Sequence, residues 1–253
     1  MGAETASVVH SHWIQTQLGR IHYRASFVTA EKCPVVLIHG LIVSGTYMIP
    51  TAECLAPRFL VYIPDLPGYG KSYKPTEVLT VSELVDALAD WMDTLKIARA
   101  HLVGNSFGCQ IIVEFAVRYP KRLGRLVLQG PTVDPAARSI GKQFLRLLIN
   151  SRREQRSMGR ITIDDYRSAG LRRICGTIKL ALRDRIETKL AMIRAPTLVV
   201  RGERDPLVPQ RWAEEVTELL PNGQLLVVAN AAHTLNYSVP EKFAAAIIPF
   251  LSL

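Results

Sequence analysis

Short apolar runs alternate with longer amphipathic stretches along most of this chain of 253 residues. The runs are rich in Val, Leu and Ile and lack a polar face, which is typical of strands buried on both sides of a parallel sheet. The pattern therefore predicts an α/β fold with a mainly parallel central sheet flanked by helices. The strands are expected at Val35–Ile38, Leu60–Ile63, His101–Val103, Leu126–Gln129, Thr197–Arg201 and Gln224–Val228, and the helices at Val81–Leu95, Phe107–Tyr119, Pro209–Leu219 and Pro240–Leu251.

Two segments depart from this alternation. Near the start, Ser11–Gln17 and Ile21–Phe27 are strand-like and meet at Leu18-Gly19, which predicts an antiparallel hairpin. Between 132 and 194 no strand-like run occurs, and we interpret this segment as a small helical cap inserted after the sixth strand of the core. The core then comprises 1–131 and 195–253, in a single catalytic domain overall. Helices of the cap are expected at Pro135–Ile149, Asp164–Gly170 and Leu171–Leu190.

Composition limits the class of protein. The chain is 48% hydrophobic and 21% charged, as expected of a globular domain with a sizeable core. It has no apolar run long enough for a transmembrane helix, and its start lacks the basic and apolar segments of a secretory signal, so we expect a cytoplasmic protein. Its four cysteines have no Cys-x-x-Cys spacing and no paired-histidine motif occurs, which predicts neither a metal site nor a cofactor.

The net charge of +9 is concentrated in the expected cap. Residues 132–194 carry 15 Lys and Arg against 6 Asp and Glu, whereas the remaining chain has 16 of each. Two interpretations of this charge stay open. The cations lie on solvated helix faces, or they attract an anionic substrate, a carrier protein or an acidic membrane surface. Nucleic-acid binding is not expected, because the basic residues lack an aromatic stacking platform or a helix-turn-helix pattern.

The candidate nucleophile is Ser106, at the centre of Gly104-Asn105-Ser106-Phe107-Gly108. This Gly-x-Ser-x-Gly pattern follows an expected strand and begins an expected helix. A turn this sharp admits only glycine-sized neighbours two residues either side of the serine, and it exposes the hydroxyl at the carboxyl end of the sheet.

Two candidate partners follow in the order nucleophile, acid, histidine. Asp205 lies just beyond the strand expected at Thr197–Arg201, and His233 lies beyond the next one. A serine nucleophile needs a base, and the base needs a third group to fix its tautomer. Glu203 and Asp134 are alternative acids, although the neighbourhood of Asp205 fits the role best.

With these motifs the chain resembles the α/β-hydrolase family over nearly its whole length, from His39-Gly40 through Asp65–Ser72 to Glu241. The resemblance implies that the backbone N–H groups of Leu41 and Phe107 form the oxyanion hole. It also implies that His39 positions its loop rather than acting as the base, and that Asp65 is a structural turn residue. One departure is Ala232, where many relatives have glycine before the histidine.

The resemblance implies a serine hydrolase that cleaves a carboxylic ester or related acyl substrate through an acyl-enzyme, with Ser106, His233 and Asp205 as its triad. Its partner would be a small-molecule acyl substrate, anionic if the charged cap attracts it. The alternatives are a carbon–carbon bond hydrolase acting on an anionic keto acid, a cofactor-free perhydrolase or acyltransferase, and a ligand-binding protein on the same scaffold.

Overall fold

The computed structural model describes residues 8–27 and 33–253, so most of the N-terminal segment that bears on a targeting signal lies outside the described residues. Its centre is an eight-stranded sheet in the order β1-β2-β4-β3-β5-β6-β7-β8. The first two strands form the predicted hairpin, and β2 pairs antiparallel with β4. All other pairings are parallel, which confirms the predicted α/β class. The strands are β1 (Val9–Gln15), β2 (Arg20–Ser26), β3 (Val35–Ile38), β4 (Val61–Pro64), β5 (Ala100–Asn105), β6 (Leu123–Gln129), β7 (Thr197–Gly202) and β8 (Gly223–Val228).

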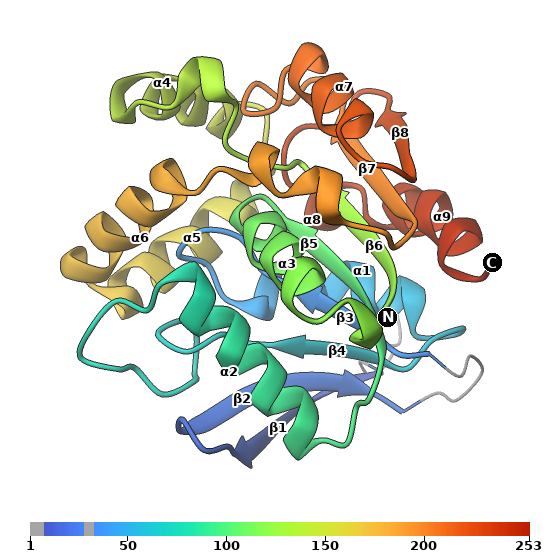
Figure 1. Cartoon of the computed structure of the whole chain (residues 1–253). Coiled ribbons are helices and arrows are strands. Elements are labelled where there is room, and N and C mark those ends of the chain that lie inside the picture. Colours follow the sequence, from blue (N-terminus) through green and yellow to red (C-terminus); the bar gives the residue numbers. More distant parts are fainter. Residues whose placement is uncertain (1–7, 28–32) are drawn as a thin grey trace, which may run out of the picture.

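Alternate strand residues point to the two faces of the sheet, and each face has its own apolar cluster. Val36 and Ile38 belong to one cluster, whereas Val35 and Leu37 belong to the other. The first cluster takes in helices α2 (Val81–Thr94), α3 (Phe107–Arg118) and α7 (Gln210–Glu218), and the second takes in α1 (Ile49–Leu55) and α9 (Pro240–Leu251). In Figure 1, α2 and α3 accordingly lie in front of the sheet and α1 behind it.

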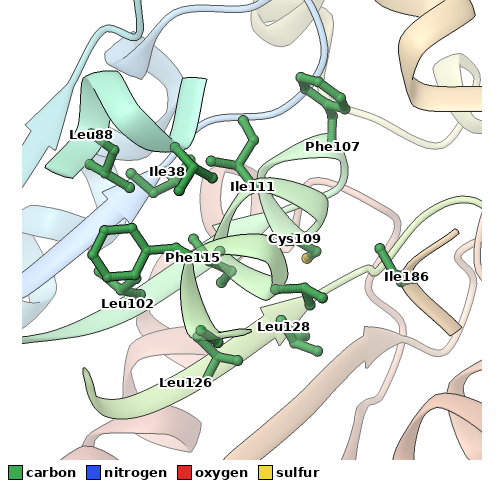
Figure 2. Packing of buried hydrophobic residues seen from close by; sticks show 14 of the residues in the cluster. Ile38, Leu88, Leu102, Phe107, Cys109, Ile111, Phe115, Leu126, Leu128 and Ile186 are labelled. Atoms are coloured by element: carbon green, nitrogen blue, oxygen red, sulfur yellow. The ribbon is translucent and has the colours of Figure 1, made fainter. Parts of the chain in front are cut away.

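Helix α3 is the best-packed link between the sheet and the first helical layer. Figure 2 shows Phe115 of this helix close to Leu102 of β5, and Ile111 close to Ile38 of β3; all four are fully buried members of the first cluster. Burying a side chain of this size stabilises the fold by roughly 1.5–3 kcal/mol. This packing fixes the start of α3, where Ser106 lies, against the end of β5.

Three helices lie between β6 and β7, where the cap is predicted: α4 (Ile140–Ser151), α5 (Arg156–Ala169) and α6 (Leu171–Arg183). Figure 1 shows α5 and α6 at the end of the sheet toward which β4 points. The limits 132 and 194 of the cap stay a prediction. A short helix, α8 (Leu235–Ser238), follows β8, and 3₁₀ turns occur at Gly45–Met48, Pro120–Arg122, Pro135–Ala137, Ile186–Thr188 and Leu190–Met192.

The predicted helix limits in this segment were wrong in three places. The first helix begins at Ile140 because the Ser139 side chain accepts from the N–H of Lys142 and caps it. The second begins at Arg156, eight residues before the expected start. The third ends at Arg183 because the next residue, Asp184, has extended backbone.

A buried carboxylate, that of Asp65, joins three segments beside the sheet. Its Oδ1 accepts from Arg24 Nη1 at 2.9 Å and from the N–H of Gly45 at 2.8 Å. Its Oδ2 accepts from His22 Nδ1 at 2.8 Å and from the N–H of Lys71 at 3.0 Å, in the turn after β4. Burial alone would raise the pKa of Asp65, but the His22 bond, the Arg24 charge and the Lys71 N–H hold it well below its usual range.

Asp65→Asn is expected to lower the free energy of unfolding by about 3–5 kcal/mol at neutral pH, because it leaves the buried Arg24 guanidinium without its carboxylate. Since the folded pKa of Asp65 is depressed, its contribution is present above the unfolded pKa of about 4 and is lost as the pH falls below that value. Urea unfolding of both proteins over a pH series measures the difference. A difference between wild type and variant that does not shrink in acid would contradict this account.

Candidate active site

Ser106 lies in a strained turn between β5 and α3. Its φ of 56° and ψ of −117° fall in a region that residues other than glycine rarely adopt. A Cβ on Gly108 would lie 2.4 Å from the carbonyl oxygen of Ile38, and one on Gly104 would lie 2.7 Å from the Gly108 backbone. The N–H of Ser106 donates to the Gln129 carbonyl at 2.9 Å. The two glycines of the motif are therefore needed because the start of α3 packs directly on the strand backbones.

Asp205 and His233, on the loops after β7 and β8, are in direct contact. His233 Nδ1 donates to Asp205 Oδ2 at 2.7 Å. The other carboxylate oxygen, Oδ1, accepts from the N–H groups of Leu207 at 2.8 Å and Val208 at 3.2 Å. The acid loop thus orients its own carboxylate, which in turn fixes the proton of the imidazole on Nδ1.

The two alternative acids contact other groups. Glu203 Oε2 accepts from the N–H of Asn230 at 2.8 Å. Asp134 Oδ2 pairs with Arg146 at 2.9 Å and its Oδ1 with Arg211 at 2.6 Å. Of the three acids that the sequence offers, Asp205 is the one whose carboxylate bonds to His233.

The second ring nitrogen of His233 is free. Its Nε2 is buried and has no hydrogen-bond partner among residues 8–27 and 33–253. His233 and Ser106 line the same cavity. Gly130 leaves room for the ring, because a Cβ there would lie 2.9 Å from His233 Cε1. With its proton held on Nδ1, the imidazole carries an unused basic lone pair on Nε2.

A hydrogen bond between histidine and carboxylate does not by itself make such a site. His22 and Asp65 form a similar pair at 2.8 Å, with both side chains fully buried. His22 is not among the residues that line the cavity. What distinguishes His233 is that its pair lies against the same cavity as Ser106.

The two predicted oxyanion donors also belong to this cavity, since Leu41 and Phe107 both line it. Phe107 is the first residue of α3, so its N–H has no partner within the helix. The hydroxyl of Tyr47 accepts from the N–H of Gly40 at 2.7 Å and donates to Asn105 Oδ1 at 2.6 Å. This bridge fixes the loop that carries Leu41 to the turn that carries Ser106.

His39 uses both ring nitrogens within its own loop. Its Nε2 accepts from the N–H of Leu66 at 3.0 Å, so the ring proton is on Nδ1, which lies 3.1 Å from the Gly40 carbonyl. Burial lowers the pKa of His39 and keeps the ring neutral. These contacts agree with the predicted positioning role and leave neither nitrogen free to act as a base.

Two carboxylates of the predominantly basic 132–194 segment bind loops near the cavity. Glu154 Oε1 accepts from the N–H of Thr234 at 2.8 Å, and its Oε2 pairs with the Thr234 hydroxyl. Asp165 Oδ2, on α5, accepts from the N–H of Ser44 at 2.7 Å and from its hydroxyl at 3.0 Å. Asn150, at the end of α4, accepts from the N–H of His233 at 3.3 Å.

The sequence interpretation missed these positioning residues. Glu154 gave a usable signal, because it is the only acidic residue between Asp134 and Asp164 in a strongly basic stretch. Tyr47 gave none, because its partner Asn105 lies 58 positions away and no short motif joins them.

The cavity has a volume of about 560 Å³, within the range of small-molecule sites. Its wall is largely apolar. Among the lining residues that the structure describes, Arg156 is the only Lys or Arg and Glu154 is the only acidic side chain. In the same described part of the chain, no group of three or more His, Cys, Asp or Glu side chains could hold a metal ion, and no helix is long and apolar enough to cross a membrane.

Charges around His233 favour its protonated form. Burial disfavours the imidazolium and lowers the pKa of His233, but the charge and hydrogen bond of Asp205, together with the charge of Glu154, outweigh it. The pKa of His233 is therefore raised above its ordinary value.

Glu154→Gln should move the titration of His233 to lower pH, because the variant keeps the acceptor oxygen for the Thr234 N–H but removes the negative charge. NMR titration of the imidazole measures the midpoint directly. Glu203→Gln is the matched control, since that carboxylate bonds to Asn230 instead. An identical midpoint in wild type and Glu154→Gln would show that this charge does not reach the ring.

Comparisons with known proteins agree with this geometry. The model of the α/β hydrolase family matches residues 35–246. A candidate carbamate hydrolase of Caulobacter sp. (strain K31) is 29% identical over 250 residues, 88% of this chain and 92% of that protein. A 2-hydroxy-6-oxononadienedioate/2-hydroxy-6-oxononatrienedioate hydrolase of Burkholderia vietnamiensis (strain G4) is 28% identical over 92% of this chain and 91% of that protein. The solved structure of a thermophilic esterase from Thermogutta terrifontis is 25% identical with a TM-score of 0.80, over 96% of this chain and 98% of that one. This chain therefore belongs to the α/β hydrolase family and is an enzyme of the hydrolase class.

Proposed function

We propose that this enzyme is a serine hydrolase that cleaves a carboxylic ester, with Ser106 as nucleophile, His233 as base and Asp205 as the acid that orients the base. One observation carries the proposal. The 2.7 Å bond from His233 Nδ1 to Asp205 leaves Nε2 buried without a partner in the described residues, on the wall of the cavity that Ser106 also lines. Proton abstraction from a hydroxyl requires a free basic nitrogen that faces the same cavity as the serine.

In the first half-reaction, Ser106 Oγ forms a bond to the ester carbonyl carbon while His233 Nε2 takes the hydroxyl proton. The carbonyl oxygen becomes negative, and the N–H groups of Leu41 and Phe107 stabilise it. The bond from the carbonyl carbon to the alcohol oxygen then breaks, and His233 gives its proton to the leaving alcohol. An acyl group remains on Ser106.

In the second half-reaction, His233 takes a proton from water as the water oxygen attacks the acyl carbon. The bond to Ser106 breaks, the carboxylic acid leaves, and the proton returns to the serine. Throughout, Asp205 stays ionised and stabilises the imidazolium. The bridge from Tyr47 to Gly40 and Asn105 keeps the two oxyanion donors in place without reorganisation during the reaction.

The cavity wall favours an uncharged ester over an anionic keto acid. Of the 15 cations in the 132–194 segment, only Arg156 lines the cavity, and Glu154 lines it as well. A dianionic substrate would need more than one cation to offset its loss of solvation. Carbon–carbon bond hydrolysis stays the second candidate. It is supported by Arg156 and by the Burkholderia relative, whose name gives a keto diacid as its substrate. Acyl transfer to an acceptor other than water uses the same acyl-enzyme.

Ser106→Ala should reduce kcat on p-nitrophenyl esters by about 10⁴-fold or more, because it removes the group that forms the covalent intermediate. The wild type should also be labelled by a fluorophosphonate, with the adduct located on Ser106 by mass spectrometry. Ser44→Ala is the matched control. Ser44 bonds to Asp165 and should not react with the fluorophosphonate, so this variant should be labelled on Ser106 as the wild type is. Wild-type turnover in Ser106→Ala would refute the proposal, and labelling without any turnover would favour the ligand-binding alternative.

Arg156→Gln separates the two substrate classes. For a neutral ester the variant should change kcat/KM by no more than about threefold, because no charge meets Arg156. For an anionic keto acid bound through this guanidinium, kcat/KM should fall about tenfold or more. Steady-state rates on a neutral ester and on a keto-acid substrate measure both values. Faster turnover of the keto acid by the wild type would reverse the preference proposed for esters.

A further inference from the structure

Helix α4 packs against the protein with its polar side. Gln143 Nε2 donates to the Ala137 carbonyl at 2.9 Å, and Arg146 bonds to Asp134 at 2.9 Å. One turn later, Asn150 is buried and contacts the backbone of His233. These three residues follow one another at helical spacing, so they define the face that the helix turns toward the molecule.

The apolar side of α4 is left exposed. Its large apolar side chains are 43–61% exposed, with Ile149 the exception; the exposed ones are Ile140, Phe144, Leu145, Leu147 and Leu148. Ile163 of α5 is 52% exposed. A surface helix ordinarily buries such a stripe and exposes its polar face. Figure 1 shows α4 at the outer edge of the fold, away from the strands.

This apolar face is continuous with the cavity. Four of the exposed side chains of α4 also line it, and so does Ile163; the four are Ile140, Phe144, Leu147 and Leu148. The mouth of the cavity is therefore apolar on its outer rim as well as inside. A contiguous exposed surface of this kind on a folded protein marks an interaction site.

The charge around α4 indicates what covers it. From Ile140 to Arg153 the chain has four cations and no acidic residue. One of them, Arg146, is paired with Asp134 on the inward side, which leaves Lys142, Arg152 and Arg153 for an outside partner. Arg152 and Arg160 are exposed as well. A second copy of the same face would bring like charges together, whereas a surface of anionic lipid would neutralise them.

We propose that α4 docks on an anionic lipid bilayer, with its apolar face among the headgroups and upper acyl chains and the neighbouring cations against lipid phosphates. This is the combination by which a surface-lying helix binds a membrane. The mouth of the cavity then opens against the bilayer, so a lipophilic ester reaches Ser106 without crossing water. This last consequence rests on the proposed function, whereas the docking does not.

Docking is tested with the Ser106→Ala variant of the full chain, so that turnover cannot consume lipid. The protein is sedimented with vesicles of equal parts phosphatidylcholine and phosphatidylglycerol, or of phosphatidylcholine alone. We expect binding to the mixed vesicles, much weaker binding to the neutral ones, and a loss of binding as salt is raised. No binding to the mixed vesicles, or a salt-resistant dimer that buries α4 in solution, would overturn the proposal.

Single substitutions test which face binds. Leu145→Ser removes an exposed apolar side chain that does not line the cavity, and should weaken vesicle binding about tenfold or more. Arg152→Gln should weaken it about fivefold. The controls are Leu171→Ser, exposed on α6, and Lys121→Gln, exposed on the 3₁₀ turn Pro120–Arg122, which should both bind as the parent does. Equal losses in test and control variants would contradict docking through α4.

The two proposals fail separately. The same substitutions made in the wild-type background should leave hydrolysis of a short, water-soluble ester unchanged, because Leu145 and Arg152 lie outside the cavity wall. Vesicle binding by a protein that hydrolyses no ester would leave the docking intact and refute the proposed function. Ester hydrolysis by a protein that does not bind vesicles would support the proposed function and refute the docking.

Discussion

The chemistry of this site depends on the position of one proton, which is held on Nδ1 of His233. The 2.7 Å bond to Asp205 fixes it there and leaves Nε2 with the lone pair. The bond is itself held from both ends. Asp205 is oriented by two N–H groups of its own loop, and the His233 backbone carbonyl accepts from Gln129 Nε2 at 2.8 Å. A buried pair is expensive to desolvate, so it persists only where such neighbours keep both partners in register.

The helices between β6 and β7 also contribute to this geometry. Asn150 bonds to the N–H of His233, Glu154 to the next residue, and Asp165 to the N–H of Ser44, in the loop after Leu41. A segment with a charge balance of +9 thus places two of its few carboxylates on the two loops that frame the cavity. The contact of Glu154 also adds negative charge beside the imidazole, which raises the pKa of His233. Positioning and electrostatics therefore come from the same side chain.

The sheet and the candidate site residues were predictable because both depend on local patterns. Val35–Ile38 and Pro240–Leu251 were predicted with their observed limits, since their apolar pattern matches their burial. Strand β6 was predicted three residues too short because Gly124 and Arg125 interrupt its apolar run while the backbone stays paired. Contacts such as Tyr47 with Asn105 could not be predicted, because they depend on how distant segments pack.

Helix α4 shows a different limit of sequence patterns. Its apolar residues do fall on one stripe, as the helical spacing predicts, but the stripe does not say which way it faces. Here the polar side has the stronger partners, because Arg146 meets the buried Asp134 and Asn150 meets the histidine loop. Burying the apolar side instead would remove Arg146 from the Asp134 carboxylate and Asn150 from the His233 N–H. The hydrogen bonds that α4 makes to the candidate active site are thus the same ones that leave its apolar face exposed.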